Sequence, residues 1–202
     1  MKEYLIQKNL IGNFLSVFEK LYICYQISLA MLHFEQRLVI HGDLAARNCV
    51  VYLGYKNNPS IHVKVSNLGL HDKYQEEYTY LNRILGNNNL YDGNSFPIPL
   101  RWQSPELILE SKQSKHSDVW SFGVCCWEIW KDGQMPYDSL SDIEVYQALK
   151  NYNLYQLDSL ADSLCPIQMW TLMEKCWLES AEMRPSFSNC ATILHSLLNN
   201  IS

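Results

Sequence analysis

The chain has 202 residues, of which 48% are hydrophobic, and it carries a formal net charge of −5. This length suits one compact domain with a buried core, so the composition excludes a chain that is disordered throughout. The excess of acidic residues offers no electrostatic footprint for a nucleic-acid backbone or an anionic membrane surface. We therefore expect a folded domain that does not bind nucleic acid.

The first half of the chain is predicted to contain a long helix followed by a small hairpin. Apolar residues recur at helical offsets over 14–34, with no Gly or Pro between them. Two short runs follow at 48–53 and 61–65, and turn-forming residues separate them. The segment 71–99 lacks periodicity and is rich in Gly and Asn, which predicts a long loop.

The second half is predicted to be helical. A short helix follows Pro105, and the run at 119–130 is apolar nearly all round, which predicts a central buried helix with Ser117 and Asp118 as its N-cap residues. Pro185 suits the first turn of the last helix. Three further helices are predicted, at 142–149, 167–177 and 185–198. The predicted fold class is mainly α, with one small β-hairpin.

The seven cysteines are scattered and include no C-x-x-C pair, so they predict neither a disulfide framework nor a zinc ribbon. Most lie in apolar runs, where a free thiol behaves as a small buried hydrophobe in a reducing compartment. No uncharged apolar stretch reaches the roughly 20 residues of a membrane-spanning helix, and the N-terminus has no signal-peptide pattern. We therefore expect a soluble, cytoplasmic chain.

The most informative string lies between the predicted long helix and the hairpin, and it reads His-Gly-Asp-Leu-Ala-Ala-Arg-Asn over 41–48. Phosphoryl transfer requires a carboxylate that orients and deprotonates the acceptor hydroxyl, and an amide oxygen four or five residues later that holds Mg²⁺. Asp43 and Asn48 have this spacing. The string closely resembles the catalytic loop of protein kinases, H-R-D-L-x-x-x-N, and the Ala-Ala-Arg ending at Arg47 resembles its tyrosine-specific version.

Four further strings follow in the order of the tyrosine-kinase family. Residues 63–69 stand where the D-F-G segment belongs, and residues 99–106 resemble the substrate-positioning loop and the A-P-E motif. Residues 117–123 resemble the signature of the central helix, and residues 176–187 include strings similar to those of the closing helices. Within the family, these strings look most like those of a branch of catalytically inactive receptors.

The resemblance covers nearly the whole chain and implies the carboxyl-terminal lobe of the protein-kinase-like fold. The domain would then span 1–202, with the amino lobe absent and a long activation-type loop at 67–106. The resemblance also implies structural roles for four residues. Glu106 and Arg184 would form a buried ion pair, Asp118 would hold the catalytic-loop backbone, and His41 would have a structural part. Taken singly, these side chains also fit solvated or capping positions.

An active kinase needs a Gly-rich loop over the phosphates, a Lys on the third strand and a Glu that pairs with it. Only forty residues precede His41, Gly12 is the single Gly among them, and the chain contains no G-x-G-x-x-G. The lobe itself also departs from the family pattern. Gly42 replaces the Arg that clamps a phosphorylated loop residue in regulated kinases.

Asn67 stands at the position of the D-F-G Asp, whose carboxylate bridges the Mg²⁺ ions in the family. An amide oxygen there is a ligand without the charge. The resemblance therefore implies that Asp43, Arg47 and Asn48 are vestigial catalytic residues, and that Asn48 and Asn67 occupy degenerate metal and Mg-ATP positions. No cofactor is expected, and Mg-ATP would bind only if the chain were part of an active enzyme.

These departures favour a tyrosine pseudokinase lobe that serves as a signalling scaffold. By resemblance, it would belong to a single-pass receptor in Wnt and planar-polarity signalling, at the cytoplasmic face of the plasma membrane, attached through a receptor portion that this chain lacks. One alternative is a fragment of an active tyrosine kinase whose amino lobe is missing. Another is a helical binding module that reuses the lobe.

The expected partners are signalling proteins, among them other kinases and phosphotyrosine readers. Tyr78 and Tyr80 follow Glu76 and Glu77 in the predicted long loop, where another kinase could phosphorylate them and readers could dock through Arg clusters. The alternative is that these tyrosines pack locally in an exposed loop.

Overall fold

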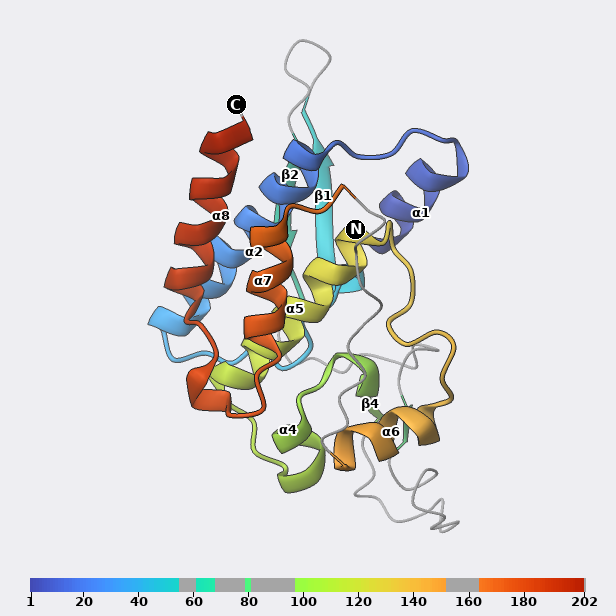
Figure 1. Cartoon of the computed structure of the whole chain (residues 1–202), viewed down its shortest axis with the longest axis vertical. Coiled ribbons are helices and arrows are strands. Elements are labelled where there is room, and N and C mark those ends of the chain that lie inside the picture. Colours follow the sequence, from blue (N-terminus) through green and yellow to red (C-terminus); the bar gives the residue numbers. More distant parts are fainter. Residues whose placement is uncertain (55–60, 68–78, 81–96, 152–163, 202) are drawn as a thin grey trace.

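The computed structural model describes residues 1–54, 61–67, 79–80, 97–151 and 164–201. Within them, helices surround one central helix, α5 (Lys115–Trp130), and a hairpin of β1 (Cys49–Leu53) and β2 (Ile61–Val65) lies against this helical body (Figure 1). The mainly helical fold and the hairpin after the catalytic-loop string agree with the sequence prediction. The remaining helices are α1 (Lys2–Leu10), α2 (Val17–Gln36), α4 (Pro105–Glu110), α6 (Asp142–Lys150), α7 (Ile167–Cys176) and α8 (Phe187–Ile201).

Short elements connect these helices. A 3-10 turn, η1 (Ala46–Asn48), leads into β1, and a second, η2 (Leu100–Trp102), precedes α4. A third, η3 (Ala181–Met183), lies between α7 and α8. The strands β3 (Thr79–Tyr80) and β4 (Pro97–Ile98) pair antiparallel. Residues 71–78 and 81–96 of the predicted 71–99 loop lie outside the described residues. Most of the predicted activation-type loop at 67–106 therefore lies outside them too.

The helix α5 is the centre of the core, because every side chain from Ser117 to Trp130 is buried. Its predicted N-cap is wrong. The helix begins earlier, at Lys115, where Ser114 and Ser117 form a capping box in which each hydroxyl accepts a hydrogen bond from the other residue's backbone N–H. Asp118 therefore lies inside the first turn of the helix, which leaves its carboxylate available for another element.

The starts of α2 and α8 also differ from the predicted starts, because other residues cap these helices. Ser16 and Glu19 form a capping box, so α2 begins at Val17. The hydroxyl of Ser186 accepts from the N–H of Asn189 at 3.2 Å, so α8 begins at Phe187 and Pro185 precedes the helix instead of lying in its first turn. No element is predicted before residue 14, yet α1 forms there, with Leu5 as its one buried side chain.

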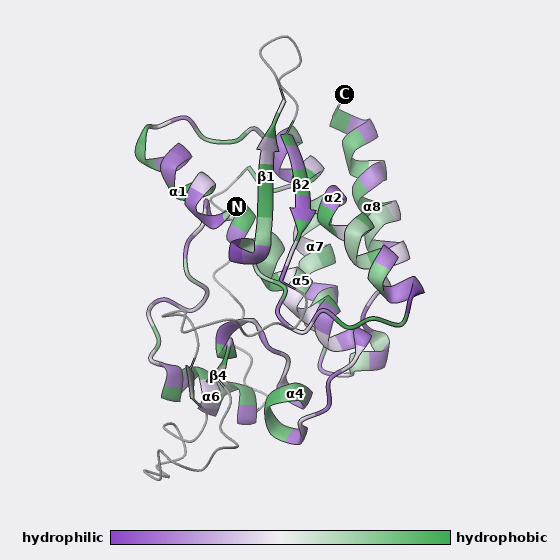
Figure 2. Cartoon of the chain, turned by 180° about the vertical axis from the view of Figure 1, so that it is seen from behind, coloured by the Kyte–Doolittle hydropathy of each residue, from purple (hydrophilic) through white to green (hydrophobic). Residues whose placement is uncertain are grey.

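The hairpin is held to α2 by a side chain that extends the strand pairing. Cys49 pairs with Val65 and Leu53 with Ile61 across the two strands. Along β2, the amide of Gln26 donates to the carbonyl of Ile61 at 3.0 Å and accepts from the N–H of Val63 at 3.0 Å. Figure 2 shows the hairpin beside α2, with α8 beyond it. Cys49, the first residue of β1 and the residue after η1, is therefore fixed relative to the helical core.

Six of the seven cysteines are buried and all seven are free thiols, in line with the prediction that they act as small core hydrophobes. Two of them, Cys125 and Cys126, lie in α5. Among the described helices, none combines the length and the apolar character that crossing a membrane requires.

The close approach of α5 and α7 at Gly123 gives a test of this packing. A Cβ at Gly123 would lie 2.6 Å from Nε1 of Trp177 and 2.8 Å from Cβ of Cys176. In an uncrowded helix, Gly→Ala stabilises by about 1 kcal/mol. Here Gly123→Ala should instead lower the free energy of unfolding by about 1–3 kcal/mol, because of overpacking. Urea denaturation measures the change, with the exposed Ser196→Ala in α8 as control. A stabilised Gly123→Ala variant would contradict the packing.

Candidate functional site

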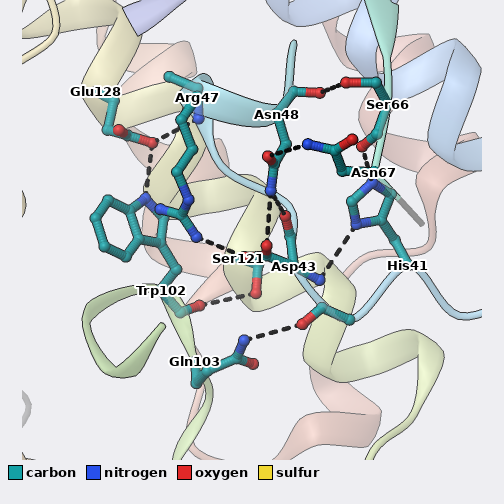
Figure 3. A network of polar contacts seen from close by, with 12 residues as sticks. His41, Asp43, Arg47, Asn48, Ser66, Asn67, Trp102, Gln103, Ser121 and Glu128 are labelled. Atoms are coloured by element: carbon teal, nitrogen blue, oxygen red, sulfur yellow. Dashed lines mark hydrogen bonds and ion pairs between the residues drawn. The ribbon is translucent and has the colours of Figure 1, made fainter. Parts of the chain in front are cut away.

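The string 41–48 forms a loop between α2 and β1, and its side chains meet those of the segments at 66–67 and 102–103 in one polar network (Figure 3). This network contains Asp43, Arg47, Asn48 and Asn67, the residues that the sequence singled out as vestigial catalytic and metal positions. His41 and Asp118 also join it. The structure therefore brings these six side chains together.

The loop backbone is anchored by Asp118 of α5. Its Oδ2 accepts from the N–H of His41 at 2.8 Å, and its Oδ1 accepts from the N–H of Gly42 at 2.9 Å. Burial raises the pKa of the Asp118 carboxyl above its ordinary value, although both backbone hydrogen bonds act in the opposite direction. This geometry is the one that the resemblance implies for Asp118.

The ring of His41 joins the loop to Ser66, the residue that follows β2. It is fully buried. Its Nδ1 accepts from the N–H of Asp43 at 3.2 Å, and its Nε2 lies 3.0 Å from the carbonyl of Ser66. Because a carbonyl oxygen only accepts, Nε2 must donate. The imidazole thus ties Asp43 to the segment that carries Asn67.

The carboxylate of Asp43 is buried and has a partner at each oxygen. Oδ1 lies 2.5 Å from Nη2 of Arg47, and Oδ2 accepts from Nδ2 of Asn48 at 2.8 Å. The Arg47 guanidinium in turn lies over the ring of Trp102, 4.3 Å from its centroid. Asp43 is therefore charge-compensated by a cation that is itself fixed by packing.

The hydrogen bonds fix the direction of both amides in the network. Nδ2 of Asn48 donates to the carbonyl oxygen of Asp43 at 2.7 Å as well as to its carboxylate. The amide oxygen of Asn48 is then left as an acceptor, and Nδ2 of Asn67 donates to it at 3.0 Å. The residue at the D-F-G Asp position thus supplies an N–H donor, where the family has a carboxylate. Asn67 also has a left-handed backbone, with φ at 61°.

Glu128 belongs to the site but was missed by the sequence reasoning. Its side chain is fully buried in α5, and Oε2 accepts from the N–H of Ala46 at 2.9 Å and from Nε1 of Trp102 at 2.7 Å. It therefore fixes the far end of the loop and the ring beneath Arg47. A signal was present, because an acidic residue within a run that is otherwise apolar is rarely buried without partners.

The segment 101–103, which follows β4, makes further hydrogen bonds to the loop and to α5. Nε2 of Gln103 donates to the carbonyl of Gly42 at 3.0 Å, and Ser121 of α5 donates to the carbonyl of Trp102 at 2.8 Å. Arg101, within the string 99–106, donates to the carbonyls of Tyr137 and Leu140. It thereby joins the segment to the loop before α6.

Gly42 is the residue that replaces the family's Arg, and its backbone adopts a left-handed φ of 78°. A Cβ there would lie 2.2 Å from Nε2 of Gln113. A longer side chain at 42 would therefore require both backbone strain and displacement of the Gln113 amide.

A second cluster joins α4 to the segment before α8. Arg184 and Glu106 form a bidentate ion pair, with 2.6 Å between Nη1 and Oε1 and 2.9 Å between Nη2 and Oε2. The guanidinium also donates to the carbonyl of His116 in α5 and lies 5.0 Å from the centroid of the Trp120 ring. Burial alone would raise the pKa of Glu106, but the hydrogen bonds and charge of Arg184 outweigh it and hold the pKa below its ordinary value.

Tyr78 and Tyr80 are the phosphorylation sites that the sequence suggests. Tyr78 lies outside the described residues, and only the backbone of Tyr80 is described, in β3. Phosphorylation at either position stays a prediction from the sequence.

Comparisons with known proteins agree with the fold and the loop. A family profile described as "Protein tyrosine and serine/threonine kinase" matches residues 1–194, and the chain belongs to this family. Inactive tyrosine-protein kinase 7 of Gallus gallus is 40% identical over 183 residues, which cover 89% of this chain and 15% of that relative. The protein of the same name from Homo sapiens is 39% identical over 183 residues.

A transmembrane receptor kinase also appears among the relatives. Tyrosine-protein kinase transmembrane receptor Ror of Drosophila melanogaster is 36% identical over 184 residues, which cover 91% of this chain and 24% of that relative. The chain thus spans less than a quarter of the length of these three curated relatives. Its similarity is to their kinase portion, and the relatives include inactive and receptor kinases.

The ion pair of the second cluster gives a prediction with a defined pH dependence. Glu106→Gln leaves the buried Arg184 guanidinium without its counter-charge, which should lower the free energy of unfolding by about 3 kcal/mol. The control is Glu110→Gln, because Glu110 pairs with Lys112 where both side chains are substantially exposed, so its loss should be below about 1 kcal/mol. Denaturant titration at pH 7 measures both, and equal losses would contradict the buried pair.

The sign of the pH dependence follows from the lowered pKa of Glu106. Stability from this group is fully present above the pKa of the unfolded carboxyl, near 4.5, and is lost as the pH falls through the lower pKa of the folded state. The difference in stability between the parent chain and Glu106→Gln should therefore shrink below pH 4.5.

Proposed function

We propose that the chain is a catalytically inactive tyrosine-kinase lobe that acts as a signalling scaffold. The hydrogen bond from Nδ2 of Asn67 to Oδ1 of Asn48 is the observation that carries this proposal. In the family, a carboxylate and an amide oxygen at these positions share Mg²⁺. Here an amide N–H already satisfies that amide oxygen, so the polar network closes without a cation.

The side chains that would have to bind Mg-ATP, at 43, 48 and 67, support the absence of Mg-ATP chemistry. A carboxylate 4 Å from a unit positive charge contributes roughly 4 kcal/mol even at an effective dielectric constant of 20. The neutral amide at Asn67 forgoes this attraction, and each 1.36 kcal/mol corresponds to about tenfold in rate. The residues at 43, 48 and 67 therefore fit Mg-ATP poorly.

The second candidate is a portion of an active tyrosine kinase. It is favoured by one observation, which is that Asp43, Arg47 and Asn48 keep the family's residue types and form one hydrogen-bonded group. In that case an amino lobe would supply the phosphate-binding loop, and Asn67 would be tolerated as a weaker ligand. Asp43 would accept the proton of the substrate hydroxyl.

The scaffold role extends to a proposed cellular setting. The similarity to inactive tyrosine-protein kinase 7 and to a transmembrane receptor kinase supports a place at the cytoplasmic face of the plasma membrane, in Wnt or planar-polarity signalling. Partners would be signalling proteins, including other kinases that modify Tyr78 or Tyr80 and the phosphotyrosine readers that follow. These assignments rest on the resemblance.

The first test is direct measurement of phosphoryl transfer. Because this chain contains no G-x-G-x-x-G string, the test uses a fusion of this chain to the amino lobe of an active tyrosine kinase. The fusion, incubated with radiolabelled ATP, Mg²⁺ and a Tyr-containing peptide polymer, should transfer no more phosphate than a sample without protein. Asp43→Asn should leave that background unchanged. Transfer that Asp43→Asn abolished would instead establish the active-kinase reading.

The second test restores the family's carboxylate. In Asn67→Asp, two acceptor oxygens would face each other across the present 3.0 Å contact, so the variant should lose about 1 kcal/mol of stability in EDTA. Added Mg²⁺ should raise its Tm, because the new carboxylate and the Asn48 amide oxygen would together offer the ion a charged ligand set. Asn67→Ala, which removes the donor without adding charge, is the matched control and should not respond. A parent chain that gained as much from Mg²⁺ as Asn67→Asp would refute the proposal.

A further inference from the structure

A groove of about 790 Å³ lies away from the catalytic-loop network. It is bounded by α4, by the start of α5 and by the segment 178–183, which connects α7 to α8. Figure 1 places α4 and this connection at the same end of the molecule. None of the residues of the Asp43 network lines the groove, so what binds there is independent of the proposed inactivity.

The groove offers apolar surface that is open to solvent. Leu178 and Met183 both line it, and their side chains are 40% and 71% exposed. A flexible, polarisable Met side chain adapts to differently shaped apolar partners. Burial of these two side chains would therefore contribute to association without requiring one particular partner shape.

Carboxylates surround this apolar surface. Glu106 and Glu110 line the groove but already have cationic partners, Arg184 and Lys112. Glu179 and Glu182 are exposed, and within the described part of the chain no ion pair involves either of them. The groove thus presents two carboxylates beside Leu178 and Met183.

His116 and Lys112, the remaining titratable side chains of the groove, do not offset the negative charge of its carboxylates. Burial, together with the charges of Lys115 and Arg184, lowers the pKa of His116 below its ordinary value, although Glu182 and Glu106 act in the opposite direction. The lowered pKa of His116 favours the neutral imidazole, and Lys112, beside Glu110, is the cationic side chain of the lining. The lining has a net negative charge.

We propose that this groove is a docking site for a basic peptide segment of a partner protein, with an apolar side chain next to Lys or Arg. The apolar side chain packs on Leu178 and Met183, and the cation lies between the carboxylates of Glu179 and Glu182. Charge complementarity selects this occupant, since an acidic segment would be repelled by the carboxylates and a neutral segment would lack the attraction.

An array of nine-residue peptides tests the proposal with the full chain. The peptides place two Arg or Lys and one Leu, Met or Phe in every order on a Gly-Ser background, and matched arrays carry Glu for the basic residues or Ser for the apolar residue. The basic apolar peptides should retain labelled protein, and both matched arrays should not. Fluorescence anisotropy on the best binder then gives the affinity, which should weaken as the salt concentration rises.

Variants locate the binding. Glu179→Gln and Glu182→Gln should each weaken binding about three- to fivefold, as expected for exposed ion pairs, and Met183→Ser about tenfold. Glu174→Gln removes an exposed carboxylate of α7 that does not line the groove and should leave the affinity unchanged. Thermal unfolding verifies that each variant is folded.

Three outcomes would overturn the proposal. One is that the basic apolar peptides bind no better than the acidic or Ser arrays. Another is affinity that the groove substitutions leave intact. The third is sedimentation of the chain alone as a dimer that Met183→Ser dissociates, which would make a second copy the occupant.

Discussion

Two carboxylates of one buried helix hold the backbone of the catalytic loop. Asp118 accepts from the first two N–H groups of the loop, and Glu128 accepts from the N–H of Ala46. They lie ten positions apart in α5, a separation of about 15 Å along the helix axis. Because α5 is buried throughout this stretch, the loop is fixed at both ends by the core.

This arrangement separates the shape of the loop from its chemistry. The hydrogen bonds that set the loop backbone come from α5, His41, Gln103 and Asn48, whereas Asn67 contacts the loop through the Asn48 side chain. Replacement of a carboxylate by an amide at 67 leaves the first set untouched. The amide also supplies the donor that Asn48 would otherwise lack, which avoids an unsatisfied acceptor. The lobe can thus lose its charge pattern without losing its fold.

The sequence predicted those parts of the fold that one strong signal determines. Apolar residues all round α5 indicated a central helix, and alternation indicated β2. Helix starts were less predictable where two serines can each cap the helix. Ser114 and Ser117 form one capping box, in which Ser114 is the N-cap of α5. The helix α1 was missed since it buries only Leu5, which gives almost no periodic pattern. Glu128 was missed because its partners, Ala46 and Trp102, are remote in sequence.

The start of α5 joins the two polar clusters of the molecule. Arg184, fixed by Glu106, donates to the carbonyl of His116, and Asp118, two residues further along the same turn, binds the loop at His41 and Gly42. Few covalent and hydrogen bonds therefore separate the groove beside the α7–α8 connection from the loop. The ion pair and the loop anchor thus share one helical turn of α5, although no residue of the Asp43 network lines the groove.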